Sequence, residues 1–285
     1  MSNDEFLAYH SSESLKRAFL NQVISARENK VFAKAAYKSK KGNKSDFISW
    51  LAPSAKPSEA LRTVSLRLGI PEELLLLTSV IYYRINESQY VAEKFLGTVE
   101  AGSDLTGCAN NILHWVLLES NSSLINHCRK KKSRALIQAC GELYAPGQIV
   151  DREIARKLET DCRERALSRK IRKKLALPDG QRSDIDLIRP EFCALWGAAR
   201  AAAWRARAVH TGHWVLLAVE AWFRAEKESF LEKNQNNEKF KTLSMRDYFE
   251  FEVAPLLAQE LFDMLLSVIR DAAQVTEVES DNSSF

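Results

Sequence analysis

Cationic side chains gather at three places in this chain: a first basic cluster at 38–44, a second at 129–134 and a third at 163–174. The third carries seven Lys and Arg residues, with Glu164 as the nearby acid. Such clusters contact phosphates or acidic protein surfaces. For the third cluster an ordinary solvated helix face is the favoured interpretation, because cations near a helix C-terminus also complement its dipole. The candidate contact residues are Arg129, Lys130, Lys131, Lys132, Arg134, Arg163, Arg165, Arg169, Lys170, Arg172, Lys173 and Lys174.

Tryptophan and arginine alternate in the stretch from Pro190 to Leu231. Winding it as one helix at about 100° per residue gathers four tryptophans and two arginines on one side. A buried core stripe, with guanidinium groups against indoles and a carboxylate, is the favoured interpretation, since tryptophans at helical spacing usually belong to cores. The alternative is an aromatic and basic groove for single-stranded nucleic acid. The six residues are Trp196, Arg200, Trp204, Arg207, Trp214 and Trp222.

The five histidines and five cysteines form no recognisable metal or nucleophile motif. His210 and His213 lie three residues apart, but no H-E-x-x-H, C-x-x-C or E-x-x-H pattern completes a site. The chain also lacks a G-x-S-x-G elbow, a P-loop and a dinucleotide fingerprint. We therefore predict no metal and no cofactor, and the motifs give no support to a hydrolase, NTPase or Rossmann enzyme.

One weaker pattern could carry catalysis. Arg205 precedes His210 by five residues in the segment Arg205-Ala206-Arg207-Ala208-Val209-His210, which we expect to be helical. This spacing resembles the R-x4–6-H element of the HEPN ribonucleases, which are small helical bundles that cleave RNA without a metal. The resemblance covers six residues. It implies that Arg205 and His210 act at the phosphodiester and that two copies of the chain meet in a dimer.

Composition places the chain among folded globular proteins. It has 285 residues, of which 46% are hydrophobic and 27% charged. The net charge of +4 is modest, so an anionic partner must be met by local clusters. We find no apolar run long enough for a membrane span and no signal-peptide pattern at the acidic N-terminus. The odd number of cysteines, without close pairs, favours reduced thiols and a cytoplasmic location.

Nearly every segment has a helical pattern, and the ten glycines and seven prolines stand mostly at joints. We predict an all-α fold of roughly ten helices packed around a buried Trp/Ala-rich helix pair at about 190–231. Pro190 suits a first helical position. The alanines from Ala198 to Ala208 would let neighbouring helices approach closely.

The string from Ser65 to Leu74 looks like the turn of a DNA-binding helix-turn-helix. A recognition helix must offer polar side chains to base edges. The second helix here instead offers Leu74 to Leu77, Val80 and Ile81. A buried helical hairpin is therefore the favoured interpretation.

Pro146-Gly147 is the best candidate for a joint between two lobes. We expect an N-terminal lobe at 1–145, a C-terminal lobe at 148–275 and a disordered acidic tail at 276–285, with a single domain as the alternative. The five residues His114 to Leu118 recur as His213 to Leu217. This match raises the possibility of duplicated halves.

The leading functional hypothesis is a non-enzymatic helical binding or adaptor protein that engages nucleic acid or an acidic protein through the second and third basic clusters. The first alternative is a HEPN-like ribonuclease. The second is a neutralising or scaffold protein that binds one protein partner through an apolar groove. Homo-oligomerisation is compatible with each of them.

Overall fold

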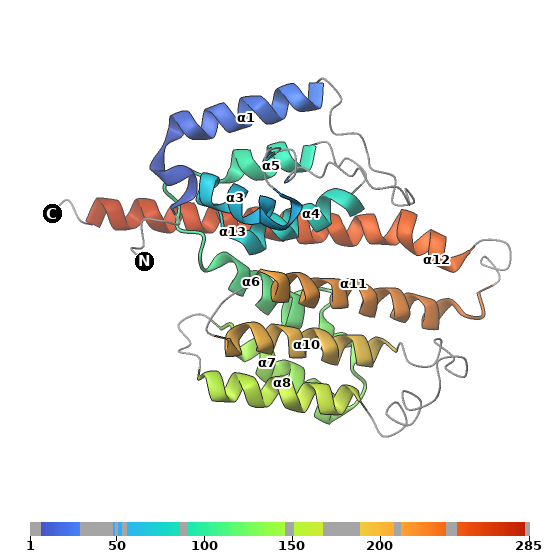
Figure 1. Ribbon diagram of the computed structural model, residues 1–285. Coiled ribbons are helices and arrows are strands. Elements are labelled where there is room, and N and C mark those ends of the chain that lie inside the picture. The colour runs from blue at the N-terminus through green and yellow to red at the C-terminus, as the bar shows by residue number, and fades with distance from the viewer. Residues whose placement is uncertain are drawn as a thin grey trace. The chain divides into compact units, whose positions relative to one another are not determined.

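A computed structural model describes residues 7–28, 48, 51–52, 56–85, 90–145, 151–167, 189–207, 212–237 and 244–282. Throughout these ranges the regular elements are helices, and the only β-type pairing is an isolated antiparallel bridge between Leu7 and Asp104. The prediction of an all-α fold is confirmed (Figure 1). None of the helices in this part of the chain is both long and apolar enough to cross a membrane.

The helices form two compact units, Met1–Ala109 with Ala254–Phe285 and Asn110–Val253, which we call unit 1 and unit 2. Unit 1 contains η2 (Ala8–Ser11), α1 (Glu13–Glu28), α3 (Pro57–Leu68), α4 (Glu72–Arg84), α5 (Val91–Thr98) and α13 (Ala254–Asn282). Between the units in sequence runs α6 (Cys108–His114). Unit 2 contains η4 (Trp115–Glu119), η5 (Leu124–His127), α7 (Lys131–Glu142), α8 (Arg152–Ala166), α10 (Pro190–Ala206), α11 (His213–Asn234), α12 (Met245–Tyr248) and η9 (Phe249–Val253).

This division differs from the lobes that we expected to meet at Pro146-Gly147, two residues that lie outside the described ranges. The segment before that joint belongs with the segment after it, because α7 packs on α8 and α10. The last helix belongs with the first half of the chain, because α13 packs on α4 and α5. The backbone of α13 is helical to Asn282, where we expected a disordered tail.

The α3–α4 hairpin in unit 1 depends on Gly69, which ends α3 with a left-handed φ of 62°. A Cβ at this position would lie 2.1 Å from the carbonyl oxygen of Leu7, so the close approach requires glycine. The following helix is buried, with Leu74, Leu75 and Ile81 at 0% exposure. The prediction of a buried hairpin instead of a recognition helix is confirmed.

Three consecutive residues before α1, from Tyr9 to Ser11, have positive φ angles, a conformation that costs about 1–2 kcal/mol per residue outside glycine. Tertiary contacts hold this turn in place. The buried Tyr9 hydroxyl donates to the Leu96 carbonyl at 2.8 Å, and His10 Nε2 lies 2.9 Å from the Leu66 carbonyl oxygen. The turn thereby ties the start of the described chain to α3 and α5.

Unit 2 is built on α10, which contacts α7, α8, α11 and η5 (Figure 1). Pro190 starts this helix, as predicted. Its small residues lie against its neighbours: Ala198, Ala201 and Ala202 are buried, and a Cβ on Gly197 would lie 2.7 Å from Leu124 Cδ1. Alanine and glycine thus let α10 approach η5 and α11 closely.

The repeated pentapeptide adopts two different structures. His114 ends α6, and the next five residues form the π-helical η4, whereas His213 begins the α-helix α11. The five-residue identity therefore corresponds to no shared local structure.

Candidate nucleic-acid interface

The second basic cluster lies at the junction of η5 and α7, where several of its members have structural roles. Arg134 donates from Nη1 to the Ile125 carbonyl at 3.1 Å. Arg129 pairs with Glu232 at 3.5 Å, and Lys130 with Glu191 at 4.0 Å. Lys131 and Lys132 are exposed in the first turn of α7 and form no ion pair with another described residue.

The described part of the third basic cluster begins in the last turn of α8. There Arg165 Nε donates to Ser133 Oγ at 3.1 Å, and Ser133 Oγ donates to Glu191 Oε1 at 2.6 Å. This network brings the second and third clusters together. Their shared groove has mixed charge, being lined by Lys132, Ala135, Leu136, Asp161, Glu164 and Arg165. Arg169, Lys170, Arg172, Lys173 and Lys174 lie outside the described residues.

Arginine and tryptophan alternate in a row that we call the ladder, which is formed by Arg163 on α8, Trp196 and Arg200 on α10, Trp214 on α11, and Arg207 directly after α10. The Arg163 and Arg200 guanidinium carbons lie 5.8 Å and 5.2 Å from the Trp196 ring centroid. Arg200 is also 5.1 Å from the Trp214 ring, and Arg207 is 4.0 Å from the same ring. Helices α8, α10 and α11 therefore contribute to one continuous cation–π arrangement.

A single carboxylate in the described chain forms ion pairs with the ladder. Glu159, 11% exposed on α8, lies 2.8 Å from Arg163 Nη2 and 3.5 Å from Arg207 Nη2. Arg200 has no ion pair with a described residue. Burial lowers the pKa of Arg200, and the like charges of Arg163 and Arg207 lower it further against the opposing effect of Glu159. Two of the three guanidinium groups thus pair with Glu159, and the third, Arg200, lies near the like charges of the other two.

The four tryptophans of this stretch divide into two pairs. Trp204 and Trp222 are buried at 4% and 0% exposure, whereas Trp196 and Trp214 are only half-buried. Winding the stretch as one helix fails because α10 ends at Ala206, and Arg207 has extended backbone with ψ of 145°. The burial expected for a core stripe holds for the first pair, and the expected contacts of guanidinium groups with indoles and a carboxylate occur at the second pair. The second pair lies with the arginines.

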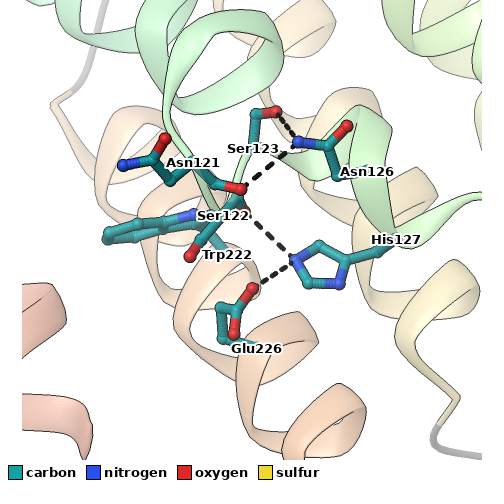
Figure 2. Close-up of polar contacts among 7 residues, drawn as sticks. All are labelled: Asn121, Ser122, Ser123, Asn126, His127, Trp222 and Glu226. Carbon is teal, nitrogen blue, oxygen red and sulfur yellow. Dashed lines mark hydrogen bonds and ion pairs between the residues drawn. The ribbon is translucent and has the colours of Figure 1, made fainter.

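A buried polar cluster holds η5 against α11 (Figure 2). His127 Nε2 lies 3.1 Å from Glu226 Oε1 and 3.1 Å from the Ser122 carbonyl oxygen. Trp222 Nε1 donates to the same carbonyl at 2.8 Å. Burial raises the pKa of Glu226, but hydrogen bonds from His127 and Ser122 and the charge of His127 more than compensate, so that this pKa lies below its ordinary value. The cluster satisfies the polar groups of a buried junction.

Arg205, half of the HEPN-like element, lies in the last turn of α10. Its Nη2 donates to the Leu143 carbonyl at 3.1 Å, and its guanidinium lies over the Tyr144 ring at 5.3 Å. These contacts tie α10 to the end of α7. His210 lies outside the described residues.

Within the described ranges, histidine side chains contact backbone and carboxylate oxygens, and the cysteine side chains are buried. His114 Nδ1 lies 3.0 Å from the Gly141 carbonyl oxygen, and its Nε2 lies 3.3 Å from Glu119. All five cysteines are buried free thiols. No group of three or more metal-ligating side chains occurs in the part of the chain that the structure describes.

Comparisons of the chain with protein family models, with curated proteins and with solved structures find no match. Two features of the site were not singled out from the sequence: Glu159 as the acid that pairs with ladder arginines, and Arg163 as a partner of Trp196. The i, i+4 spacing of Glu159 and Arg163 could have indicated the ion pair. The contact with Trp196 depends on the packing of α8 against α10.

Proposed function

We propose that this protein is a non-enzymatic nucleic-acid-binding protein and that the ladder is its principal contact surface. One observation carries the proposal: two half-buried indoles position three guanidinium groups, of which Arg163 and Arg207 pair with Glu159 while Arg200 has no ion pair with a described residue. Bringing them together costs electrostatic energy, which a bound anion would relieve. The planar guanidinium group also matches the geometry of phosphate oxygens.

Nucleic acid is favoured over an acidic protein because of the aromatic members of the ladder. Phosphate contacts require cations alone, whereas surfaces that bind nucleic acid strands combine cations with aromatic rings. Lys131 and Lys132, exposed at the start of α7, supply further positive charge in the same unit.

The test is a salt titration of binding to a labelled oligonucleotide of about 20 nucleotides, between about 50 and 200 mM salt. We expect the wild-type association constant to fall steeply with salt. In Arg200→Gln we expect weaker binding at every salt concentration and a log–log slope that is shallower by about 0.7, which corresponds to one phosphate contact with a single strand.

Arg156→Gln is the matched control, because Arg156 lies two turns before Arg163 on α8 and pairs with Glu153 outside the ladder. It should bind like the wild type. Absent binding at low salt, binding insensitive to salt, or equal losses in both variants would rule out the ladder as the contact surface.

The non-enzymatic part of the proposal rests on the structural contacts of Arg205 with Leu143 and Tyr144. A labelled RNA of the same length as the oligonucleotide should therefore stay intact on prolonged incubation with the protein. Cleavage that disappears in His210→Ala would instead favour the HEPN-like ribonuclease.

The five buried free thiols fit a reducing compartment, in agreement with a cytoplasmic location.

A further inference from the structure

We propose that the ladder selects single-stranded over double-stranded nucleic acid, with bases stacking on Trp196 and Trp214 and phosphates contacting Arg200 and its neighbours. This inference rests on the proposed function and adds the class of ligand. It is carried by the alternation of cation and flat ring along the ladder and by the partial exposure of its two indoles.

The alternation matches the repeat of a single strand, in which each nucleotide offers one charged phosphate and one flat apolar base. The guanidinium carbons of Arg163 and Arg200 lie within 5.8 Å of the Trp196 ring centroid, and those of Arg200 and Arg207 lie within 5.1 Å of the Trp214 ring centroid. A strand that follows this row meets positive charge and aromatic surface in turn. Sequence-tolerant binding by stacking and phosphate contact needs these two components.

The exposure of the indoles distinguishes the ladder from a structural stack. Trp204 is buried against Tyr144, at a ring distance of 6.2 Å with the rings nearly parallel, and Trp222 is fully buried. Trp196 and Trp214 remain half-buried although they belong to the same two helices. Phe192 stacks on Trp196 with the ring centroids 5.7 Å apart and places a further aromatic ring beside the ladder on α10.

Arg200 is the phosphate contact that the geometry favours most. Glu159 pairs with Arg163 and Arg207, the two outer guanidiniums, and leaves the middle one to its two indole partners. A phosphate at Arg200 would therefore displace no carboxylate of the described chain. Its negative charge would also reduce the repulsion among the three arginines.

A duplex can contact only the arginines of the ladder, because the faces of its bases are already stacked on one another inside the double helix. Its phosphates could reach the arginines while the indoles gained nothing. An acidic peptide would likewise contact the guanidiniums and offer no base to the rings. The indoles therefore predict selectivity for strands with accessible bases.

The experiment compares the wild-type affinity for a labelled single strand of about 20 nucleotides with that for the duplex of the same sequence at one salt concentration. We expect the single strand to bind at least about tenfold more tightly, since stacking on one ring is worth about fivefold to 150-fold and the ladder offers two rings. Tryptophan fluorescence should be quenched by the single strand and little changed by the duplex.

Trp214→Leu should lose about tenfold or more in affinity for the single strand and keep its affinity for the duplex. Trp214→Phe keeps an aromatic face and should retain most of the preference. This variant also serves if the leucine variant does not fold, as judged by circular dichroism. The wild-type comparison requires no variant.

The outcomes separate the two proposals. Equal, salt-dependent affinity for single strand and duplex would overturn single-strand selection and leave nucleic-acid binding in place, as would an unchanged preference in a folded Trp214→Leu. Binding of poly-glutamate with no binding of either nucleic acid would overturn both proposals and identify an acidic protein as the ligand. No binding of any anion at low salt would also overturn both.

Discussion

Glu226 is a carboxylate of α11 at 18% side-chain exposure, and its contact with His127 of η5 makes its charge part of the fold of unit 2. It accepts hydrogen bonds from His127 and Ser122, and its pKa lies below the ordinary value. A carboxyl group whose pKa is lower in the folded state than in the unfolded state stabilises the folded state at pH values above the unfolded-state pKa. That stabilisation is lost as the pH falls through the folded-state pKa.

Glu226→Gln should lower the free energy of unfolding by about 1–3 kcal/mol near pH 7, because the hydrogen bonds lose their charged acceptor. The difference from wild type should shrink as the pH falls below about 4.5, the ordinary glutamate pKa, towards the depressed folded-state pKa. Urea unfolding of both proteins at a series of pH values measures this difference in the free energy of unfolding. A difference independent of pH would contradict the assignment. Glu232→Gln, on the same helix with 40% side-chain exposure, should change stability by less than about 0.5 kcal/mol.

The five cysteines should be unreactive in the folded protein. Burial raises the pKa of Cys108, Cys128 and Cys193 to about 12, so hardly any reactive thiolate is present at pH 8. Cys140 and Cys162 are also buried, with their sulfur atoms 3.6 Å apart. A colorimetric thiol reagent should modify none of the five rapidly in buffer and all five in denaturant. Rapid native labelling of any of them would show that its helix opens readily.

At the scale of elements, the spacing between helices depends on small residues, and two glycines allow a matched comparison. A Cβ at Gly197 would lie 2.7 Å from buried Leu124 and 3.1 Å from the Ala221 Cβ, whereas one at Gly97 meets only Leu20, at 3.9 Å. Gly197→Ala should therefore destabilise the protein by about 1–3 kcal/mol through overpacking. Gly97→Ala should stabilise it by up to about 1 kcal/mol through helix propensity.

Chemical denaturation of the two variants gives both values. The substitution is chemically identical in the two variants. Opposite signs of the change in unfolding free energy would therefore identify the packing of α10 against η5 and α11 as the cause. Equal effects would show that α10 moves to accommodate the added methyl group.

Local chemistry made much of this architecture predictable from sequence. Asp151 caps α8 by accepting a hydrogen bond from the Glu153 amide at 2.8 Å, and Pro190 starts α10. The relative rotation of helices was not predictable in this way. Trp196 and Trp204 follow the same periodic pattern, yet one is half-buried beside arginines and the other is buried beside Tyr144. Tertiary packing of α8 and α11 on α10 decides between them.

At the scale of the whole molecule, the two compact units do not follow the order of the chain. Unit 1 joins 1–109 to 254–285, because the apolar face of α13 packs on α4 and α5. An amphipathic pattern predicts that a helix has a buried face, but it does not name the partner helices. A joint expected from Pro146-Gly147 therefore missed a division that depends on contacts between the two ends of the chain.

A destabilising substitution in α13 should consequently increase local unfolding in helices near the N-terminus. The helices of unit 2, which are closer to α13 in sequence, should be unaffected. Leu265 is fully buried on α13, and Leu265→Ala should cost about 2–5 kcal/mol by leaving a cavity in unit 1. Hydrogen exchange should then rise in α4 and α5, which precede the mutated residue by more than 160 positions, and stay unchanged in α8 and α10. Leu256→Ala, at a 70% exposed position of the same helix, should leave exchange unaltered in both units. If Leu265→Ala raised exchange equally in α10, the two units would unfold as one cooperative body, and the division seen in their contacts would carry no energetic meaning.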